Sequence, residues 1–172
     1  MIDYGHCVKL GPLCEEHLDS YREARNDRRI WRWCRQKSLI DEMSHEAWFE
    51  AQSADPTIEM FEVLDTADEL VGVCGLTDIN HHAQRAEFSL YIMPEHHGNG
   101  YAEGALRTLV NFGFKELNLN MVFGETVGEN PAEALFEKVG FIHTGFRPSY
   151  YFKDGAYQDS HLWCLLRDSW EF

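Results

Sequence analysis

Three apolar-rich stretches in the middle of the chain are bounded by short polar turns. They span residues 58–64, 70–79 and 86–93, and the turns between them read TADE and HHAQ. Runs of this length and composition predict strands, and short turns join antiparallel neighbours. We therefore expect a three-stranded antiparallel meander, with a short strand over residues 6–10 before it.

A helical period begins after two closely spaced glycines. Apolar residues recur there near the spacing of one helix face, at Ala102, Ala105, Leu106, Leu109, Phe112 and Leu117, and predict a long amphipathic helix that covers the sheet. The other elements expected are helices over 14–25, 45–53 and 131–139 and strands over 121–127, 141–152 and 157–166. Trp48 and Phe49 are expected to anchor the second helix in the core. Asn130, Pro131 and Gly140 supply the start and stop signals of the third. The whole, residues 1–172, reads as one α/β domain.

The strand over 86–93 has one apolar and one polar face. Phe88, Leu90 and Ile92 point one way, and Glu87, Ser89 and Tyr91 the other. A central strand is normally covered on both faces. A polar face there indicates an open cleft rather than core.

Gly98 and Gly100 lie between this strand and the long helix. Glycines at such a turn let backbone N–H groups approach a ligand, and a helix N-terminus favours a phosphate anion. The chain has no Gly-x-x-x-x-Gly-Lys-Ser/Thr element, and Gly98-Asn99-Gly100 lacks the third glycine of a dinucleotide motif. The turn therefore predicts a pyrophosphate cradle for a ligand other than ATP or NAD.

Two motifs, EHHGNGYAEGAL and ENPAEALFEKVGF, together with GVCGLTDIN, RAEFSLYI and KDGAYQDS, occur in an order that resembles the GNAT superfamily of acetyl-CoA-dependent N-acetyltransferases. The similarity is greatest to the branch of spermidine, ribosomal-protein N-terminal and amino-sugar acetyltransferases. It implies a single mixed, mostly antiparallel sheet, flanked by helices and splayed between the fourth and fifth strands. It also implies an acyltransferase that moves an acetyl group directly from acetyl-CoA to a primary amine.

The resemblance also places the cosubstrate. Backbone groups near Tyr91, Ile92 and Met93 are expected to pair with the pantetheine arm. The further positions expected to bind acetyl-CoA are His97, Gly98, Asn99, Gly100, Tyr101, Ala102, Asn130 and Phe136.

The acceptor amine must lose a proton before or during attack, because an amine of this type has a pKa of about 10.4. Glu87 is the first candidate for the base, and its alternative role is an ion pair with Arg85 or another cation. Glu125 on the adjoining strand is the second candidate. Tyr91 is expected to position the amine or relay protons, and Ser89 to contact the substrate.

Phe136 departs from the family pattern, in which many members carry a tyrosine that protonates the leaving thiolate. One interpretation is an acetyl-CoA-binding protein with little turnover. A second is that the acid is dispensable, because a thiol with a pKa near 8.5 leaves readily as the thiolate. A third is a substitute donor among Tyr150, Tyr151 and Tyr157. We favour a working enzyme.

The charge distribution bears on the acceptor. Twenty-nine acidic residues against fifteen Lys and Arg give a net charge of −14, which argues against a nucleic-acid partner. Residues 22–37 differ, with seven cations and two carboxylates. Such a run is usually a solvated helix face. Alternatively, Arg29, Trp31 and Trp33 bind the diphosphate and base of a nucleotide-linked amino sugar.

Three acceptors remain open: that amino sugar, which we favour, a polyamine such as spermidine, and a protein N-terminus. The arginines weaken the polyamine alternative, because the spermidine enzymes have an acidic region there. The relatives often pair, so a homodimer is one expectation.

The cysteines, the histidines and the hydropathy of the chain bear on metal binding, redox state and location. The five cysteines contain no C-x-x-C pair, and adjacent histidines in turns do not form a ligand set, so we expect reduced thiols and no metal. We also expect no membrane span and no signal peptide, and hence a cytoplasmic protein.

Overall fold

Seven strands form one sheet in the order β1-β2-β3-β4-β5-β7-β6 in the computed structural model, which describes residues 1–171. The strands are β1 (Lys9–Pro12), β2 (Glu59–Leu64), β3 (Leu70–Asn80), β4 (Arg85–Ile92), β5 (Met121–Val127), β6 (Ile142–Lys153) and β7 (Ala156–Leu166). The helices are α1 (Leu18–Asn26), α2 (Arg28–Trp31), α3 (Glu42–Ala54), α4 (Tyr101–Lys115) and α5 (Glu133–Val139), with short 3-10 turns η1 (Glu15–His17), η2 (Pro94–His96) and η3 (Arg167–Ser169). The predicted order of elements is confirmed.

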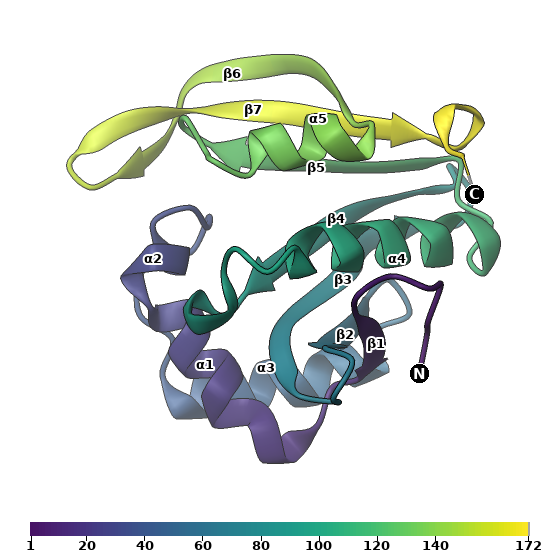
Figure 1. The fold of residues 1–172 in the computed structure, drawn as a ribbon. Helices are drawn as coiled ribbons and strands as arrows, with labels where there is room; N and C mark the ends of the chain where they lie inside the picture. The colour runs from purple at the N-terminus through teal and green to yellow at the C-terminus, as the bar shows by residue number, and fades with distance from the viewer. Residues whose placement is uncertain (172) are drawn as a thin grey trace.

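The sheet divides between β4 and β5. These two strands are parallel and share only three register pairs, the last of which joins Glu87 to Phe123. All other neighbours in the sheet are antiparallel. Figure 1 shows the resulting separation, with β5, β6 and β7 above and β1 to β4 below. The predicted mixed sheet, splayed between its fourth and fifth strands, is confirmed.

Two apolar clusters hold the helices to the sheet. The larger one lies beneath α4, where Leu106, Leu109 and Phe114 are fully buried against side chains such as Leu76 and Val122. The smaller one packs α1 and α2 on the sheet through Tyr21, Ala24, Ile30, Val73 and Met93. Leu90 and Tyr91, neighbours on β4, contact the larger and the smaller cluster respectively. The alternation predicted for β4 is therefore confirmed, but Tyr91, on the face predicted to be polar, packs against apolar side chains.

Several local details differ from the predictions. The basic segment contains α2, which Asp27 caps by accepting a hydrogen bond from the Arg29 amide. In α3 the buried residue is His45, while Trp48 is 36% exposed, because His45 stacks between Trp48 and the body of the protein. The strand expected over 6–10 is β1, which begins at Lys9.

The start of α5 also differs from the prediction. The helix begins at Glu133, and Pro131 lies in the turn before it. Asn130 still caps this turn, because its side-chain oxygen accepts a hydrogen bond from the Ala132 amide. Gly140 ends the helix in the left-handed conformation, as the sequence predicts. Within residues 1–171, no helix has both the length and the apolar composition needed to cross a bilayer.

Candidate active site

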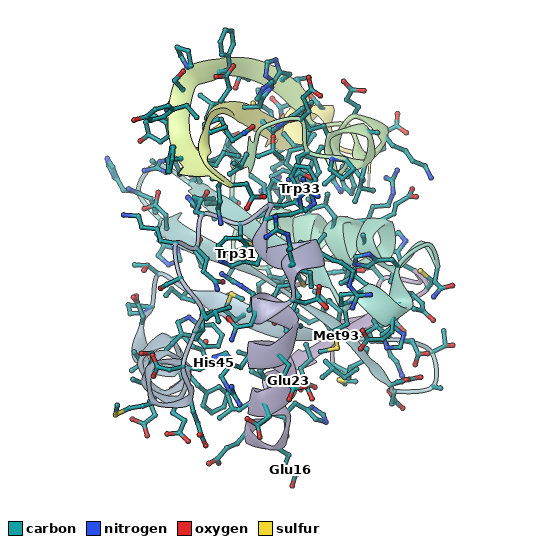
Figure 2. The ribbon with its side chains drawn as sticks, turned by 90° about the vertical axis from the view of Figure 1, so that its left-hand side faces the viewer. Glu16, Glu23, Trp31, Trp33, His45 and Met93 are labelled. Atoms are coloured by element: carbon teal, nitrogen blue, oxygen red, sulfur yellow. The ribbon has the colours of Figure 1, made fainter. Side chains whose placement is uncertain are left out.

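A cavity of about 870 Å³ opens where β4 and β5 separate. Its walls come from β4, β5, the start of α4, α5 and the segment that follows α2. Figure 2 looks into the molecule from the side of α1 and α2, and Trp33 lies there between the upper strands and the lower body. The cavity therefore has two ends, one at the glycine turn and one at the basic segment.

The glycine turn forms the first end. Gly98 and Gly100 have φ values of +86° and +79°, which favour glycine, and an added Cβ at either would meet nothing within 4 Å. Gly100 is the N-cap of α4 and no side chain caps this helix. Both glycines line the cavity with His97, Tyr101 and Ala102. The uncapped helix start thus faces the cavity with N–H groups suited to an anion.

Asn99 and Met93, both predicted to bind acetyl-CoA, lie outside the cavity lining. Asn99 is exposed and donates a side-chain hydrogen bond to the His96 carbonyl. The Met93 amide donates to the Val71 carbonyl on β3, and the Met93 carbonyl accepts from the His96 amide. The amide and the carbonyl of Met93 therefore each already have a partner within the protein.

Tyr91 and Ile92 do line the cavity. The Ile92 carbonyl accepts a hydrogen bond from the His97 ring at 2.7 Å, which ties the end of β4 to the turn. Burial raises the pKa of the Tyr91 hydroxyl, so it stays protonated in the physiological range. The Arg25 guanidinium lies 5.9 Å from the Tyr91 ring centroid.

Two carboxylates face each other across the separated strands. Glu87 on β4 and Glu125 on β5 both line the cavity, and their side chains are only 14% and 9% exposed. One nitrogen of Arg35, Nη1, lies 3.0 Å from Glu87 Oε1 and 3.1 Å from Glu125 Oε1. The cation paired with Glu87 is thus Arg35, since Arg85 pairs with Asp78 instead.

Glu125 has further partners. Ser160 donates to Oε2 at 2.7 Å, Arg147 lies 3.1 Å from the same oxygen, and the Tyr151 hydroxyl donates to Oε1. Burial works to raise the pKa of Glu125, but these hydrogen bonds and the charges of Arg35 and Arg147 outweigh it, so the pKa lies below its usual range. Glu125 is a fully partnered carboxylate, whereas the described contacts of the Glu87 side chain are with Arg35 alone.

Phe136 closes one side of the cavity. Its ring packs edge-on against Phe88, at 5.0 Å between centroids, and against Trp163 at 5.8 Å. Tyr150 and Tyr157 are exposed on the β6–β7 hairpin, and neither they nor Tyr151 lines the cavity. Of the three predicted substitute donors, Tyr151 reaches the site through Glu125, to which its hydroxyl donates, and Tyr150 and Tyr157 lie away from it.

The Arg29, Trp31 and Trp33 group is divided. Arg29 lines the cavity but binds Asp27 at 2.6 Å. Trp33 also lines it, whereas Trp31 packs its ring against Lys153 Nζ, 4.0 Å from the centroid. Ser89, the remaining predicted substrate residue, lines the cavity on β4.

Sequence reasoning missed Arg35 and Lys153. Lys153 is buried, and its ammonium donates to the backbone carbonyls of Trp31 and Gln36. Its place in a polar, exposed hairpin gives no sequence signal of burial. Arg35 is one of seven cations in residues 22–37, and nothing in the sequence distinguishes it from the others.

The comparisons with known proteins agree with this geometry. Residues 8–142 match the acetyltransferase (GNAT) domain family. The chain belongs to that family. It is 28% identical to a spermidine N(1)-acetyltransferase of Escherichia coli K12 over 94% of this chain and 87% of the relative, and 33% identical to one of Vibrio cholerae over 64% of each. A putative ribosomal N-acetyltransferase of Bacillus subtilis is 30% identical over 59% of this chain and 56% of its own length.

Solved structures show the same relationship. A spermidine N-acetyltransferase from Vibrio cholerae, in complex with CoA and spermine, superimposes with a TM-score of 0.90 at 27% identity, over 95% of this chain and 97% of that one. A dodecameric form of the Vibrio cholerae enzyme gives a TM-score of 0.82 at 27% identity, over 94% and 95% of the two chains. The protein is therefore an acetyl-CoA-dependent N-acetyltransferase of GNAT type. This supports the enzyme over the binding protein considered for Phe136.

Proposed function

We propose that this enzyme acetylates a primary amine of a polyamine, of the spermidine type. The observation that carries the proposal is the pair of buried carboxylates, Glu87 and Glu125, on opposite sides of the cavity where β4 and β5 separate. An ammonium group leaving water needs such counter-charges. Relatives that match most of the chain are named as spermidine acetyltransferases.

The nucleotide-linked amino sugar favoured from sequence lacks this support. No relative or solved structure reported above is named for such an acceptor. The segment expected to bind the nucleotide is also occupied: Arg29 pairs with Asp27, and Trp31 packs against Lys153 outside the cavity. We therefore replace that prediction with the polyamine.

The reaction we propose is direct transfer. The neutral amine attacks the thioester carbonyl carbon, a C–N bond forms, and the C–S bond breaks with its electron pair going to sulfur. The acceptor binds as an ammonium and gives its first proton to Glu87, and the second proton, lost when the C–N bond forms, passes to solvent. Glu125 supplies charge rather than basicity, because four side chains already engage its oxygens. The thiolate leaves without a donor at Phe136 and takes its proton from solvent.

The cosubstrate end follows from the same geometry. We propose that the N–H groups at Gly98, Gly100, Tyr101 and Ala102 bind the pyrophosphate, and that the pantetheine arm runs along Tyr91 and Ile92. Asn130 and Phe136 line the opposite wall. Arg29 also lines the cavity, but its guanidinium is paired with Asp27.

The test is thiol release from acetyl-CoA with a panel of acceptors. The panel contains spermidine, spermine, glucosamine, a nucleotide-linked amino sugar and a peptide with a free N-terminus. We expect the highest kcat/KM with spermidine or spermine. A higher value with another class would overturn the polyamine assignment, and binding of acetyl-CoA without release for any amine would contradict turnover itself.

We also propose that copies of the chain associate through β6. This strand is an edge of the sheet and carries exposed apolar side chains, among them Ile142, Phe146 and Phe152. A neighbour of similar fold is dodecameric. Light scattering after gel filtration should show an oligomer that Phe152→Lys weakens, and a monomer at micromolar concentration would contradict it. The cytoplasmic location stays a prediction.

A further inference from the structure

Arg35 joins the two halves of the divided sheet. Its Nη1 contacts one oxygen of Glu87 on β4 and one of Glu125 on β5, at 3.0 and 3.1 Å. Glu87 belongs to the last register pair between these strands, and Glu125 lies two residues beyond that pair. Both carboxylates and Arg35 line the cavity. A cation of the protein itself therefore occupies the place where the proposed acceptor would lose its proton.

The three partners differ in exposure. The carboxylates are largely buried, whereas the Arg35 side chain is 52% exposed. When two buried groups bind one half-exposed group, the exposed one can leave for water at the smaller desolvation cost. Arg35 is thus the member of this cluster that can move away.

The backbone around Arg35 is fixed. Lys153, buried in the β6–β7 hairpin, donates to the carbonyls of Trp31 and Gln36 on either side of it. The side chain of Asn26 on α1 holds Gln36 and Ile40. Movement is therefore confined to the Arg35 side chain, and the segment that carries it stays in place.

A guanidinium resembles the acceptor in charge but not in reactivity. It carries one positive charge and several N–H donors, as an ammonium does, yet it stays protonated and offers no lone pair for attack. It can therefore hold both carboxylates ionised without being acetylated. Exchange of guanidinium for substrate ammonium leaves the net charge of the cluster unchanged.

We infer that Arg35 occupies the acceptor's ammonium position in the free enzyme and must be displaced by the acceptor, which makes it a specificity-determining residue. The inference rests on the proposed acceptor site at Glu87 and Glu125. Arg35 competes with every acceptor, and only a group that replaces its charge between both carboxylates binds well. A neutral or anionic acceptor leaves the guanidinium where it is.

The first experiment compares steady-state kinetics of the wild type, Arg35→Gln and Arg28→Gln with spermidine. Arg28 is a matched control, since it is exposed and pairs with Asp154 outside the cavity. In Arg35→Gln, removing a half-exposed competitor should lower the KM for the amine about fivefold and leave the KM for acetyl-CoA within about twofold of the wild type. In the Arg28→Gln control, both KM values should stay within about twofold of the wild type. An unchanged or higher amine KM in Arg35→Gln would overturn the inference.

Inhibition by a free guanidinium tests directly whether the Arg35 side chain and the amine share one position. In Arg35→Ala, free methylguanidinium should enter the vacated place and inhibit competitively against the amine, at least about tenfold more strongly than in the wild type. Equal inhibition of the two proteins would mean that the guanidinium and the amine do not share a site.

A third measurement separates this inference from the choice of polyamine. In protein labelled with ¹⁵N-arginine, the Arg35 side-chain signals, identified by their absence in Arg35→Gln, should be protected from exchange in the free enzyme. Saturating n-butylamine should remove that protection even if spermidine is not turned over. Protection that persists at saturating n-butylamine and spermidine alike would overturn displacement, whatever the acceptor panel shows.

Discussion

The two ends of the cavity carry different kinds of binding groups. At the glycine turn the binding groups are backbone N–H groups at the start of α4, which no side chain caps. At the other end they are side chains, Glu87, Glu125 and Arg35, brought from three separate parts of the chain and paired with one another. The first end offers backbone N–H groups suited to an anion, whereas at the second end the charged side chains already bind one another.

This difference determines which residues at each end can vary among related enzymes. A backbone cradle depends on local conformation, and most side chains around it can vary. A cluster of charged side chains depends on each member, because removing one partner leaves a buried charge uncompensated. The cosubstrate end is therefore suited to a common donor, and the acceptor end to differences between related enzymes.

The largest expected effect breaks the acceptor end. Glu87→Gln removes the proposed base and keeps the shape of the side chain, so kcat should fall by about 10²- to 10⁴-fold, the usual range for general base catalysis. Acetyl-CoA affinity should stay the same. Glu59→Gln, an exposed position on β2, is the control in the same rate assay. A Glu87→Gln enzyme with normal kcat would exclude Glu87 as the base.

The next breaks the cosubstrate end. Gly98→Val places a branched side chain at φ +86° in space that the ligand needs, so the Kd for acetyl-CoA should rise about tenfold or more. Gly155→Val is a matched control, with φ +80° and nothing within 4 Å, in the β6–β7 turn. Calorimetric titration measures both. Equal affinities in the two variants would remove the phosphate contact from this turn.

A smaller effect should come from the wall between the two ends. Phe136→Tyr introduces a hydroxyl at the cavity, and donation to the leaving thiolate should raise kcat about tenfold. Phe141→Tyr is the control, because Phe141 is buried in the same aromatic group but does not line the cavity. Single-turnover rates with acetyl-CoA decide it. A rate that rises in neither variant would mean that thiolate departure is not limiting.

The smallest expected effect concerns the ion pair between Asp27 and Arg29. Hydrogen bonds from Arg29 hold the pKa of Asp27 at about 2, below its ordinary value. A lowered pKa stabilises the folded chain above the unfolded value of about 3.9, and this contribution is lost as pH falls towards 2. Asp27→Asn should cost about 1 kcal/mol of unfolding free energy at pH 6 and progressively less below pH 4. Urea unfolding across this range measures it, and a pH-independent difference would contradict the ion pair.

The same contrast explains what the sequence could predict. The order of elements, the polar face of β4 and the glycine turn are local patterns, readable within a few residues, and the fold follows from them. The contact of Arg35 with Glu125 spans 90 positions. Its formation depends on how α2 and the β6–β7 hairpin meet, and no periodicity encodes that.

Individual errors have the same cause. The neighbours of Met93 predict a pantetheine contact, but its amide donates to the Val71 carbonyl and its carbonyl accepts from the His96 amide. Trp31 and Trp33 are two residues apart, yet one packs on Lys153 and the other lines the cavity. In each case a tertiary contact decided the outcome, and the residue type alone left it open.

The three register pairs between β4 and β5 have a consequence for the life of the protein in the cell. Beyond them the two strands have no neighbour on that side among residues 1–171, and this is the opening in which we propose that acetyl-CoA binds. A ligand that binds only the folded chain adds about 2.7 kcal/mol at a concentration one hundred times its Kd. The lifetime of this protein should therefore follow the supply of its donor: when acetyl-CoA is scarce, the enzyme becomes easier to unfold and degrade.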